Sequence, residues 1–257
     1  MKKYNDLPPL VPNYTTTRIE TALDIAAKRR FFTLIFGQTG RGKTLTAEYW
    51  ARKRNDAVFV GLKSAQNVAG LVRELAEAVL GQDYQSTQKN KSELCQFLQS
   101  NERLIIIDEA NQLLLSPNPR TIAKSLEFLR RDIYDLTGTP LVLIFTSIKY
   151  SEFRHGRMAS FMEQFRRRVN YNLEIPSSIL TKSDILPIMS AYTDNPSSKL
   201  LAAATAIASA GDGKIGTLVK YLDLAKEYIA TKGGSITPEL LISLQERHEG
   251  GGKWPED

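Results

Sequence analysis

The sequence predicts an α/β protein in which a parallel β-sheet lies between helices and is followed by a small helical unit. Two observations predict the sheet. Five short apolar runs alternate with segments of helical periodicity up to about residue 175, and a glycine-rich turn joins the first run directly to the next helix. A third observation predicts the helical unit, because only helical periodicity remains after residue 183.

Each element follows from its local pattern. Short apolar runs predict buried strands, which we place at residues 31–36, 57–61, 104–108, 141–146 and 169–174. Apolar residues three and four apart predict helices of the sheet region, which we place at residues 15–30, 43–53, 68–80, 91–98, 122–136 and 158–168. The same spacing predicts four later helices, at residues 183–193, 197–210, 215–230 and 238–247. We expect the three threonines at 15–17 to cap the first helix.

These elements predict four parts of the chain. Prolines break the apolar residues at the start, so residues 1–14 are expected to form an extended arm. The α/β domain is expected over residues 15–178, with the boundary near Pro176, and the helical domain over residues 179–247. The glycine-rich residues 248–257 are expected to form a flexible tail.

The composition excludes several classes of protein. The single cysteine, Cys95, excludes an intrachain disulfide and a cysteine-based zinc site, and two histidines argue against a histidine metal cluster or a Ser-His triad. No apolar run approaches the roughly 18 residues of a membrane span, and no signal peptide is evident, so we expect a cytoplasmic protein without membrane contact. The net charge of +6 favours a polyanionic partner, although ordinary surface charge is the alternative.

The glycine-rich turn matches the phosphate-binding pattern G-x-x-x-x-G-K-[ST] in full. Its glycines let backbone N–H groups turn inward around phosphates, and the positive N-terminal end of the next helix adds to the attraction. Lys43 can reach the β- and γ-phosphates, and Thr44 can bind Mg²⁺. A chance glycine turn is the alternative. The predicted phosphate-binding residues are Gly37, Gln38, Thr39, Gly40, Arg41, Gly42, Lys43 and Thr44.

Two carboxylates end the third apolar run, in the sequence L-I-I-I-D-E at residues 104–109. Because adjacent strand residues point in different directions, the two acids can do different work. Asp108 would hold the Mg²⁺ shell, and Glu109 would polarise the attacking water as a general base. Two solvated acids at a strand end are the alternative. A glutamate directly after the aspartate favours hydrolysis over nucleotide binding alone.

With both motifs in place, the chain resembles an AAA+ ATPase. The resemblance implies ATP and Mg²⁺ as ligands and hydrolysis to ADP and phosphate at subunit interfaces. It implies that Thr146, or in reserve Ser147, senses the γ-phosphate from the end of the fourth strand. It also implies that Arg166, or else Arg167, is an arginine finger facing a neighbouring subunit's nucleotide. The alternatives are a strand cap at Thr146 and a basic helix face at the arginines.

A closer resemblance is to a compact group of AAA+ proteins: the phage Mu B protein, TnsC-type regulators of transposition and IstB-like helper ATPases. It rests on the short chain, the run I-I-D-E-A-N-Q-L at 106–113, the Glu-x-Phe-Arg segment and the lid sequence G-K-I-G-T-L at 213–218. It covers roughly residues 15–247.

The chain departs from this group in two ways. Thr217 stands where TnsC-like chains carry a lid arginine, so Lys214 or Lys220 would have to replace it at the nucleotide. Only about 30 residues precede the first strand, too few for the N-terminal DNA-binding domain of the Mu B protein, so any DNA binding is expected to use the ATPase core.

The group's DNA-binding loops have counterparts after the second strand and before the helix at 91–98. Lysines at phosphates give affinity without sequence readout, which suits a protein that accepts many target sites. Solvated loops are the alternative. The DNA-binding candidates are Lys63, Ser64, Thr87, Lys89 and Lys91.

The resemblance implies an ATP-dependent regulator of DNA transposition. Such a protein oligomerises on duplex DNA as a ring or helical filament, recruits or stimulates a transposase, with or without a targeting adaptor protein, and disassembles on hydrolysis. Two alternatives remain open. One is a loader of a replicative helicase, which would prefer single strands, and the other is a nucleotide-gated scaffold that binds only proteins.

Overall fold

The computed structural model describes residues 10–63, 67–81, 86–146, 151, 163–176, 182–210 and 215–249. The chain divides into two compact units. The α/β unit contains Arg18–Gln38 and Lys43–Pro176, and the helical unit contains Ser177 onward together with Pro9–Thr17 and Thr39–Gly42. No helix of the described residues is long and apolar enough to cross a membrane.

A five-stranded sheet with the order β2-β3-β4-β1-β5 forms the centre of the α/β unit, and all its strand pairs are parallel. The sequence-based prediction of a parallel five-stranded sheet is therefore confirmed. The strands are β1 (Phe32–Gly37), β2 (Ala57–Gly61), β3 (Leu104–Asp108), β4 (Leu141–Thr146) and β5 (Val169–Glu174).

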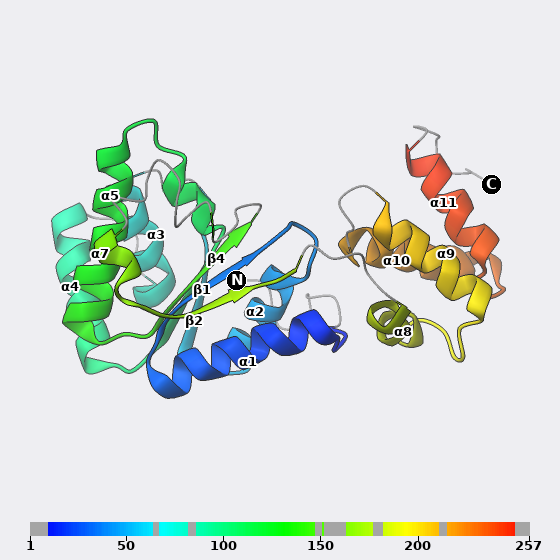
Figure 1. Ribbon diagram of the computed structural model, residues 1–257, viewed down its shortest axis with the longest axis horizontal. Coiled ribbons are helices and arrows are strands. Elements are labelled where there is room, and N and C mark those ends of the chain that lie inside the picture. The colour runs from blue at the N-terminus through cyan, green and yellow to red at the C-terminus, as the bar shows by residue number, and fades with distance from the viewer. Residues whose placement is uncertain are drawn as a thin grey trace. The chain divides into compact units, whose positions relative to one another are not determined.

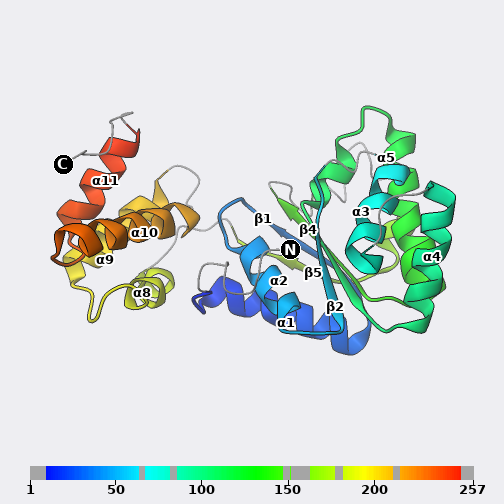
Figure 2. The same cartoon turned by 180° about the vertical axis from the view of Figure 1, so that it is seen from behind.

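Helices cover both faces of the sheet (Figures 1 and 2), because alternate strand side chains point to opposite faces. Leu34 and Phe36 of β1 pack into an apolar core with helices α3 and α4, whereas Ile35 packs into a second core with α1 and α2. The helices of this region are α1 (Tyr14–Arg29), α2 (Lys43–Arg52), α3 (Val68–Leu80), α4 (Thr87–Ser100), α5 (Pro119–Glu127) and α7 (Glu163–Arg166).

Side-chain caps explain where two helices begin differently from the prediction. The first helix is capped by Asn13, whose side-chain oxygen accepts from the N–H groups of Thr15 (2.9 Å) and Thr16 (3.1 Å), so the threonines are not the cap. Helix α4 starts at Thr87 rather than at residue 91, because Ser86 caps it by accepting from the N–H of Lys89. Polar caps thus decide these boundaries where apolar spacing is weak.

The predicted helix at 122–136 is longer and changes type. Asn118 caps it by accepting from the N–H of Arg120, and a proline occupies its first turn. From Phe128–Asp135 the helix widens into a π-helix, η3. A short 3₁₀ helix, η2 (Ala110–Leu114), follows β3 directly and was not expected. The sequence pattern predicts the helical face here but not these changes of pitch.

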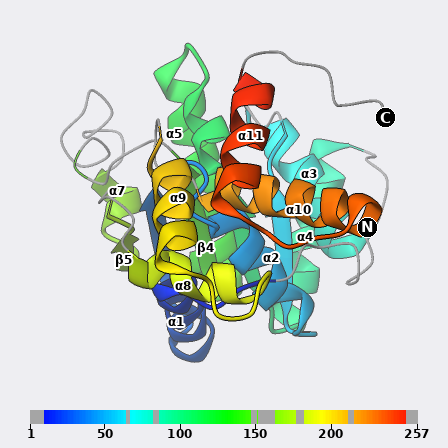
Figure 3. The ribbon, with the colours of Figure 1, turned by 90° about the vertical axis from the view of Figure 1, so that its right-hand side faces the viewer.

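The helical unit packs its apolar residues into a core of its own, which includes Ile188, Leu200, Leu218 and Leu241. Helix α9 contacts the other three helices of the described part of this unit, as can be followed in Figure 3. Burial and the neighbouring carboxylate of Asp223 raise the pKa of Tyr192, whose hydroxyl donates to that carboxylate at 2.7 Å. The helices are α8 (Lys182–Ser190), α9 (Ser198–Ser209), α10 (Ile215–Lys232) and α11 (Pro238–Glu249).

Candidate nucleotide site

The glycine-rich turn joins β1 to α2, as predicted, and its glycines are required by the backbone. Gly40 and Gly42 both have φ near +77°, a conformation that L-residues with side chains rarely adopt. At Gly37 a Cβ atom would lie 3.0 Å from the Cβ of Ile175, so only glycine allows this close approach at the end of β1. The turn therefore depends on glycine at each of these three positions.

Lys43 is the first residue of α2, and its side chain folds back over the turn that precedes it. The residue is 4% exposed. Its ammonium donates to the carbonyl oxygen of Gly37 at 2.9 Å and to that of Gln38 at 2.8 Å. These bonds hold a positive charge at the turn, where this motif places the phosphates of a nucleotide.

Asp108 ends β3 beside Thr44 and Lys43 and is almost fully buried, at 1% exposure. Burial raises its pKa, while a hydrogen bond from the Thr44 side chain and the charge of Lys43 act in the opposite direction. Its Oδ1 atom has no hydrogen-bond partner among the described residues. A buried carboxylate oxygen without a partner is costly, and a bound cation would satisfy it.

The two oxygen donors, Asp108 and Thr44, fit Mg²⁺. This ion prefers oxygen ligands, keeps several waters and is commonly held by one or two carboxylates together with substrate phosphates. Within the described ranges, no group of three His, Cys, Asp or Glu residues is placed to hold a metal. Two protein oxygen donors thus fit an ion that is held together with the phosphates of a nucleotide.

Glu109 has a strained backbone directly after β3. Its φ of +53° and ψ of +37° lie in the left-handed region, which costs a non-glycine residue on the order of 1–3 kcal/mol. Its carbonyl accepts from the N–H of Gln112 at 2.9 Å as the chain enters η2. Strand alternation predicts different directions for the two acids, and the left-handed backbone of Glu109 ends this alternation directly after Asp108.

Thr146 lies at the end of β4 and pairs in register with Gly37, the residue that enters the phosphate turn. Its N–H donates to the side-chain oxygen of Asn111 at 3.4 Å. Asn111 thus connects the end of β4 to the turn that follows the acidic pair. Sequence reasoning gave this asparagine no role, although it lies three residues after Asp108 in the I-I-D-E-A-N run. The reserve candidate, Ser147, lies outside the described residues.

The arginine candidates lie at the opposite end of the sheet from the phosphate turn. Phe165 of α7 is buried and packs edge-on against Phe32, with ring centroids 4.9 Å apart. Phe32 begins β1 and the phosphate turn follows its end, so the length of the strand, about 17 Å, separates them. The structure therefore does not bring Arg166 and Arg167 to the acidic pair of their own chain.

Ion pairs support the segment that carries these arginines. Arg167 is exposed and pairs with Glu163 at 2.6 Å. Arg168 donates to Asp135 at 2.9 Å, and the same carboxylate accepts from Arg130 at 2.6 Å. Arg166 is half-buried. The segment is thus held on both sides of Arg166, by the buried Phe165 ring and by Asp135.

The lysines predicted to bind DNA have different surroundings. Lys63 is exposed just after β2, and its ammonium has no ion pair within the described part of the chain. Lys89 is exposed and lies 3.7 Å from Glu93. Lys91 pairs with Asp132 at 2.9 Å and lies over the Phe128 ring, so its charge already supports the packing of α4 on η3.

The remaining candidates are distributed between the two units. Thr87 begins α4, and Ser64 lies outside the described residues. Thr217 and Lys220 lie on α10 of the helical unit, where Lys220 is exposed. Lys214 also lies outside the described residues. A lid lysine at the nucleotide therefore stays a prediction from the sequence.

Residues 26–151 match the protein family described as AAA domain. The ORC2 protein of Aeropyrum pernix, solved in ADPNP–ADP complexes, is similar to the chain with a TM-score of 0.69 and 18% identity over 94% of this chain and 70% of that one. The chain described here has the P-loop AAA+ ATPase fold. The phosphate turn lies within the residues that match the AAA domain, and its geometry fits the phosphates of a nucleotide.

Two further solved structures share this AAA+ fold. One is the ORC1 protein of Aeropyrum pernix in complex with DNA, with a TM-score of 0.65 and 18% identity over 94% of this chain and 67% of that chain. The other is domain III of the replication initiation protein DnaA of Thermotoga maritima, with a TM-score of 0.58 and 15% identity over 93% of this chain and 97% of that one. No match was found among curated protein sequences.

Proposed function

We propose that this AAA+ protein binds ATP with Mg²⁺ at the phosphate turn and hydrolyses it. The observation that carries the proposal is the buried Asp108 oxygen, which has no hydrogen-bond partner among the described residues although Thr44 and Lys43 lie beside this carboxylate. Lys43 would hold the β- and γ-phosphates, and Thr44 and Asp108 would hold the ion. When bound, Mg²⁺ neutralises the charge that develops on the transferred phosphoryl group.

Glu109 and Thr146 complete the proposed site. Glu109 would orient and polarise the attacking water from its left-handed backbone position directly after Asp108. Thr146 would contact the γ-phosphate from the strand next to β1, which places it in register with the entrance to the phosphate turn. Asn111 would position Thr146 through its backbone N–H.

Hydrolysis is proposed to need a second subunit. The phosphate turn and α7 lie at opposite ends of β1, so Arg166 or Arg167 would serve the nucleotide of a neighbouring copy. An arginine supplied in this way stabilises the transition state and couples turnover to assembly. The proposed active form is therefore a homo-oligomer, either a ring or a helical filament.

We further propose that the oligomer assembles on duplex DNA and regulates DNA transposition. It would recruit or stimulate a transposase, with or without a targeting adaptor, and leave the DNA after hydrolysis. The net charge of +6 and the exposed Lys63 and Lys89 support the DNA contact. The similar ORC1 protein, which was solved in complex with DNA, supports it as well.

Replication initiation or helicase loading is the second candidate. It is favoured by the similarity to the ORC proteins and to domain III of DnaA, which is a replication initiation protein. The two candidates differ in the partner that they predict. Capture of a transposase by the ATP-bound oligomer would support the first, and capture of a replicative helicase with preference for single strands would support the second.

The Glu109→Gln variant tests the proposal, because it should bind ATP without hydrolysing it. Negative-stain electron microscopy with ATP and duplex DNA should show long-lived rings or filaments, whereas the wild type should assemble and then disperse. Glu246→Gln, an exposed change on α11, is the matched control and should behave as the wild type. Monomers of Glu109→Gln that are indifferent to duplex DNA would contradict the proposed assembly.

A further inference from the structure

Strand β2 is one edge of the sheet, and only β3 pairs with it among the described residues. The N–H of Leu62 donates to the carbonyl of Asp108, and the N–H of Leu104 donates to that of Asp56. Because bonding alternates along a parallel strand, the backbone groups of Ala57, Phe59 and Gly61 point away from β3. In the described parts of the chain, no hydrogen bond uses these outward groups. Three residues of β2 thus present backbone donors and acceptors to solvent.

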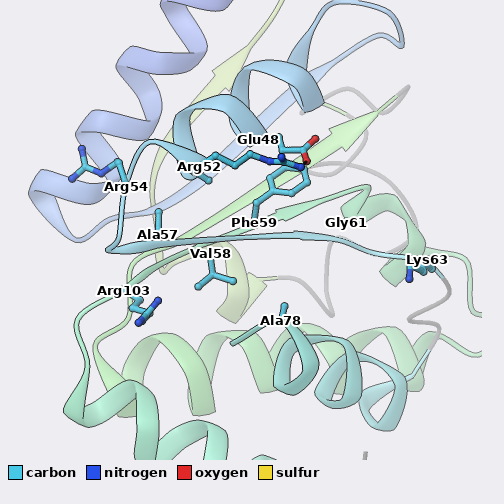
Figure 4. Close-up of a pocket in the computed structure, with 11 residues that line it drawn as sticks. Glu48, Arg52, Arg54, Ala57, Val58, Phe59, Gly61, Lys63, Ala78 and Arg103 are labelled. Atoms are coloured by element: carbon cyan, nitrogen blue, oxygen red, sulfur yellow. Dashed lines mark hydrogen bonds and ion pairs between the residues drawn. The ribbon is translucent and has the colours of Figure 1, made fainter. Parts of the chain in front are cut away.

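An open groove of about 720 Å³ runs along this edge (Figure 4). Ala51 and Arg52 of α2 line one side of it, and Ala78 of α3 lines the other. Phe59 points toward α2 and Val58 toward α3. The edge therefore has an apolar surface on each face of the strand. An added strand needs this arrangement, because its side chains also alternate between the two faces.

The groove is mainly basic, with four cationic side chains and one acid lining it: Arg52, Arg54, Lys63, Arg103 and Glu48. Arg52 pairs with Glu48, and Arg54 pairs with Asp56 at 2.9 Å. Among the described residues, neither Lys63 nor Arg103 has an ion pair within 4.0 Å, although the Arg103 guanidinium lies 5.6 Å from the centre of the Phe97 ring. Because no carboxylate is in direct contact with either cation, both can approach an acidic ligand.

These two cations lie near opposite ends of the strand (Figure 4). Arg103 directly precedes Leu104, the register partner of Ala57, and Lys63 follows the end of β2 by two residues. At about 3.3 Å per residue, the positions of Arg103 and Lys63 along the strand are roughly 20 Å apart. An extended segment of about seven residues covers this distance and would place one carboxylate at each end.

We propose that the groove binds an extended acidic segment of a partner protein, which adds a strand to the free edge of β2. The segment has carboxylates at both ends, about seven residues in all, and small or β-branched apolar residues between them. The outward backbone groups favour a peptide over a nucleic acid. Another peptide backbone pairs with both the N–H and the C=O groups, whereas phosphates would engage the cations alone and leave the carbonyls and the apolar sides unused.

Three synthetic peptides separate strand addition from simple attraction of charge. The parent is a fluorescein-labelled Glu-Val-Thr-Val-Ala-Val-Glu amide, measured by fluorescence anisotropy against the full-length protein. The second peptide has the same sequence with its three central residues N-methylated, and the third has lysines in place of both glutamates. The parent should bind, and each of the other two should bind at least about tenfold more weakly, because one loses backbone pairing and the other loses charge complementarity.

Two protein variants place the binding at β2. Arg103→Glu should weaken binding of the parent peptide about tenfold, and Arg120→Glu, an exposed reversal at the start of α5, should leave it unchanged. Gly61→Pro should weaken binding by removing one outward N–H, at a position where a Cβ atom would approach no closer than 4.0 Å to Phe59. Retained binding of a fluorescent ATP analogue would show that each variant is folded.

The contrary outcomes are also defined. Equal binding of the parent and the N-methylated peptide would overturn strand addition, and so would unchanged binding by both Arg103→Glu and Gly61→Pro. Displacement of the parent peptide by a short DNA duplex, together with weaker duplex binding by Arg103→Glu, would identify a phosphate site and overturn the proposal. None of these measurements depends on ATP hydrolysis. Lys63 belongs to both proposals but Arg103 only to the groove, so the Arg103→Glu variant distinguishes a failure of the groove from a failure of the proposed function.

Discussion

The two ends of β1 differ in how their polar groups are satisfied. At the phosphate-turn end, the buried Asp108 has an oxygen without a partner among the described residues, and Glu109 has a strained backbone. At the opposite end, Asp135 accepts from two arginines, and the buried Phe165 supports α7. One end therefore has unmet bonding capacity that a ligand would satisfy. The other end has a framework of ion pairs that leaves Arg167 exposed and Arg166 half-buried. A site divided between two copies of a chain needs both features.

The largest expected effect is at Lys43, on the ligand-binding end. Lys43→Ala removes the ammonium held over the turn, so binding of ATP and any assembly that depends on it should be lost. Titration with a fluorescent ATP analogue measures this, with Lys124→Ala, an exposed change on α5, as the control. Wild-type affinity in Lys43→Ala would mean that the turn is not the nucleotide site, and the contrast between the two ends would lose its basis.

The next effect concerns the arginine end. Arg166→Ala should keep ATP binding but lower turnover by about 10³-fold or more, because an arginine finger acts mainly on the transition state. Steady-state phosphate release measures turnover. If Arg167 is the finger instead, Arg167→Ala should show this loss and Arg166→Ala should not. Unchanged turnover in both variants would remove the proposed role from α7.

A mixing experiment tests directly whether the two ends belong to different subunits. Neither Lys43→Ala nor Arg166→Ala should hydrolyse ATP alone. In mixed oligomers, however, an intact phosphate turn from one chain meets an intact arginine from the other, so part of the activity should return. Recovery that rises with the mixing ratio and then falls supports action between subunits. No recovery at any ratio, in mixtures shown to co-assemble, would contradict it.

The elements of this comparison were not equally predictable from the sequence. The turn, the position of Asp108 at a strand end and the five strands themselves could be predicted, because glycine spacing and short apolar runs reflect local requirements of the backbone. The π-helical pitch of η3 could not, because it depends on packing and on ion pairs such as Arg130 with Asp135. The left-handed backbone conformation of Glu109 could not be predicted either, because glutamate has no preference for that conformation. Lys91 looked like a DNA contact in sequence, but its partner Asp132 is distant in the chain.

A smaller effect concerns pH and the buried Asp108. Burial raises its pKa in the folded protein, so the folded state binds more protons than the unfolded state between the ordinary carboxyl pKa and the raised one. The stability that this residue contributes is therefore present at low pH and is lost as the pH rises through that window. The Asp108→Asn variant lacks this loss, so its melting temperature relative to the wild type should increase with pH.

Thermal unfolding across this pH range measures the effect, with the exposed Asp194→Asn as the control. Mg²⁺ with a nucleotide should raise the melting temperature of the wild type most at high pH, where Asp108 is ionised, and should raise that of Asp108→Asn less. If the difference in melting temperature between the wild type and Asp108→Asn were the same at every pH, burial would not raise the pKa of this carboxylate.

The smallest expected effect separates two lysines that look alike in sequence. Lys63 has no ion pair within the described residues, so Lys63→Gln should reduce the slope of log affinity for duplex DNA against log salt by about one unit, equally for all sequences. Lys91 is engaged with Asp132, so Lys91→Gln should leave the slope unchanged and lower the melting temperature instead, because it removes the closer of the two cations that pair with this largely buried carboxylate and leaves only Arg131 at 3.5 Å. Filter binding at several salt concentrations, with thermal unfolding of both variants, measures this. If the two lysines exchanged these effects, the ion pair of Lys91 would not persist in solution, and α4 rather than the end of β2 would be the DNA contact.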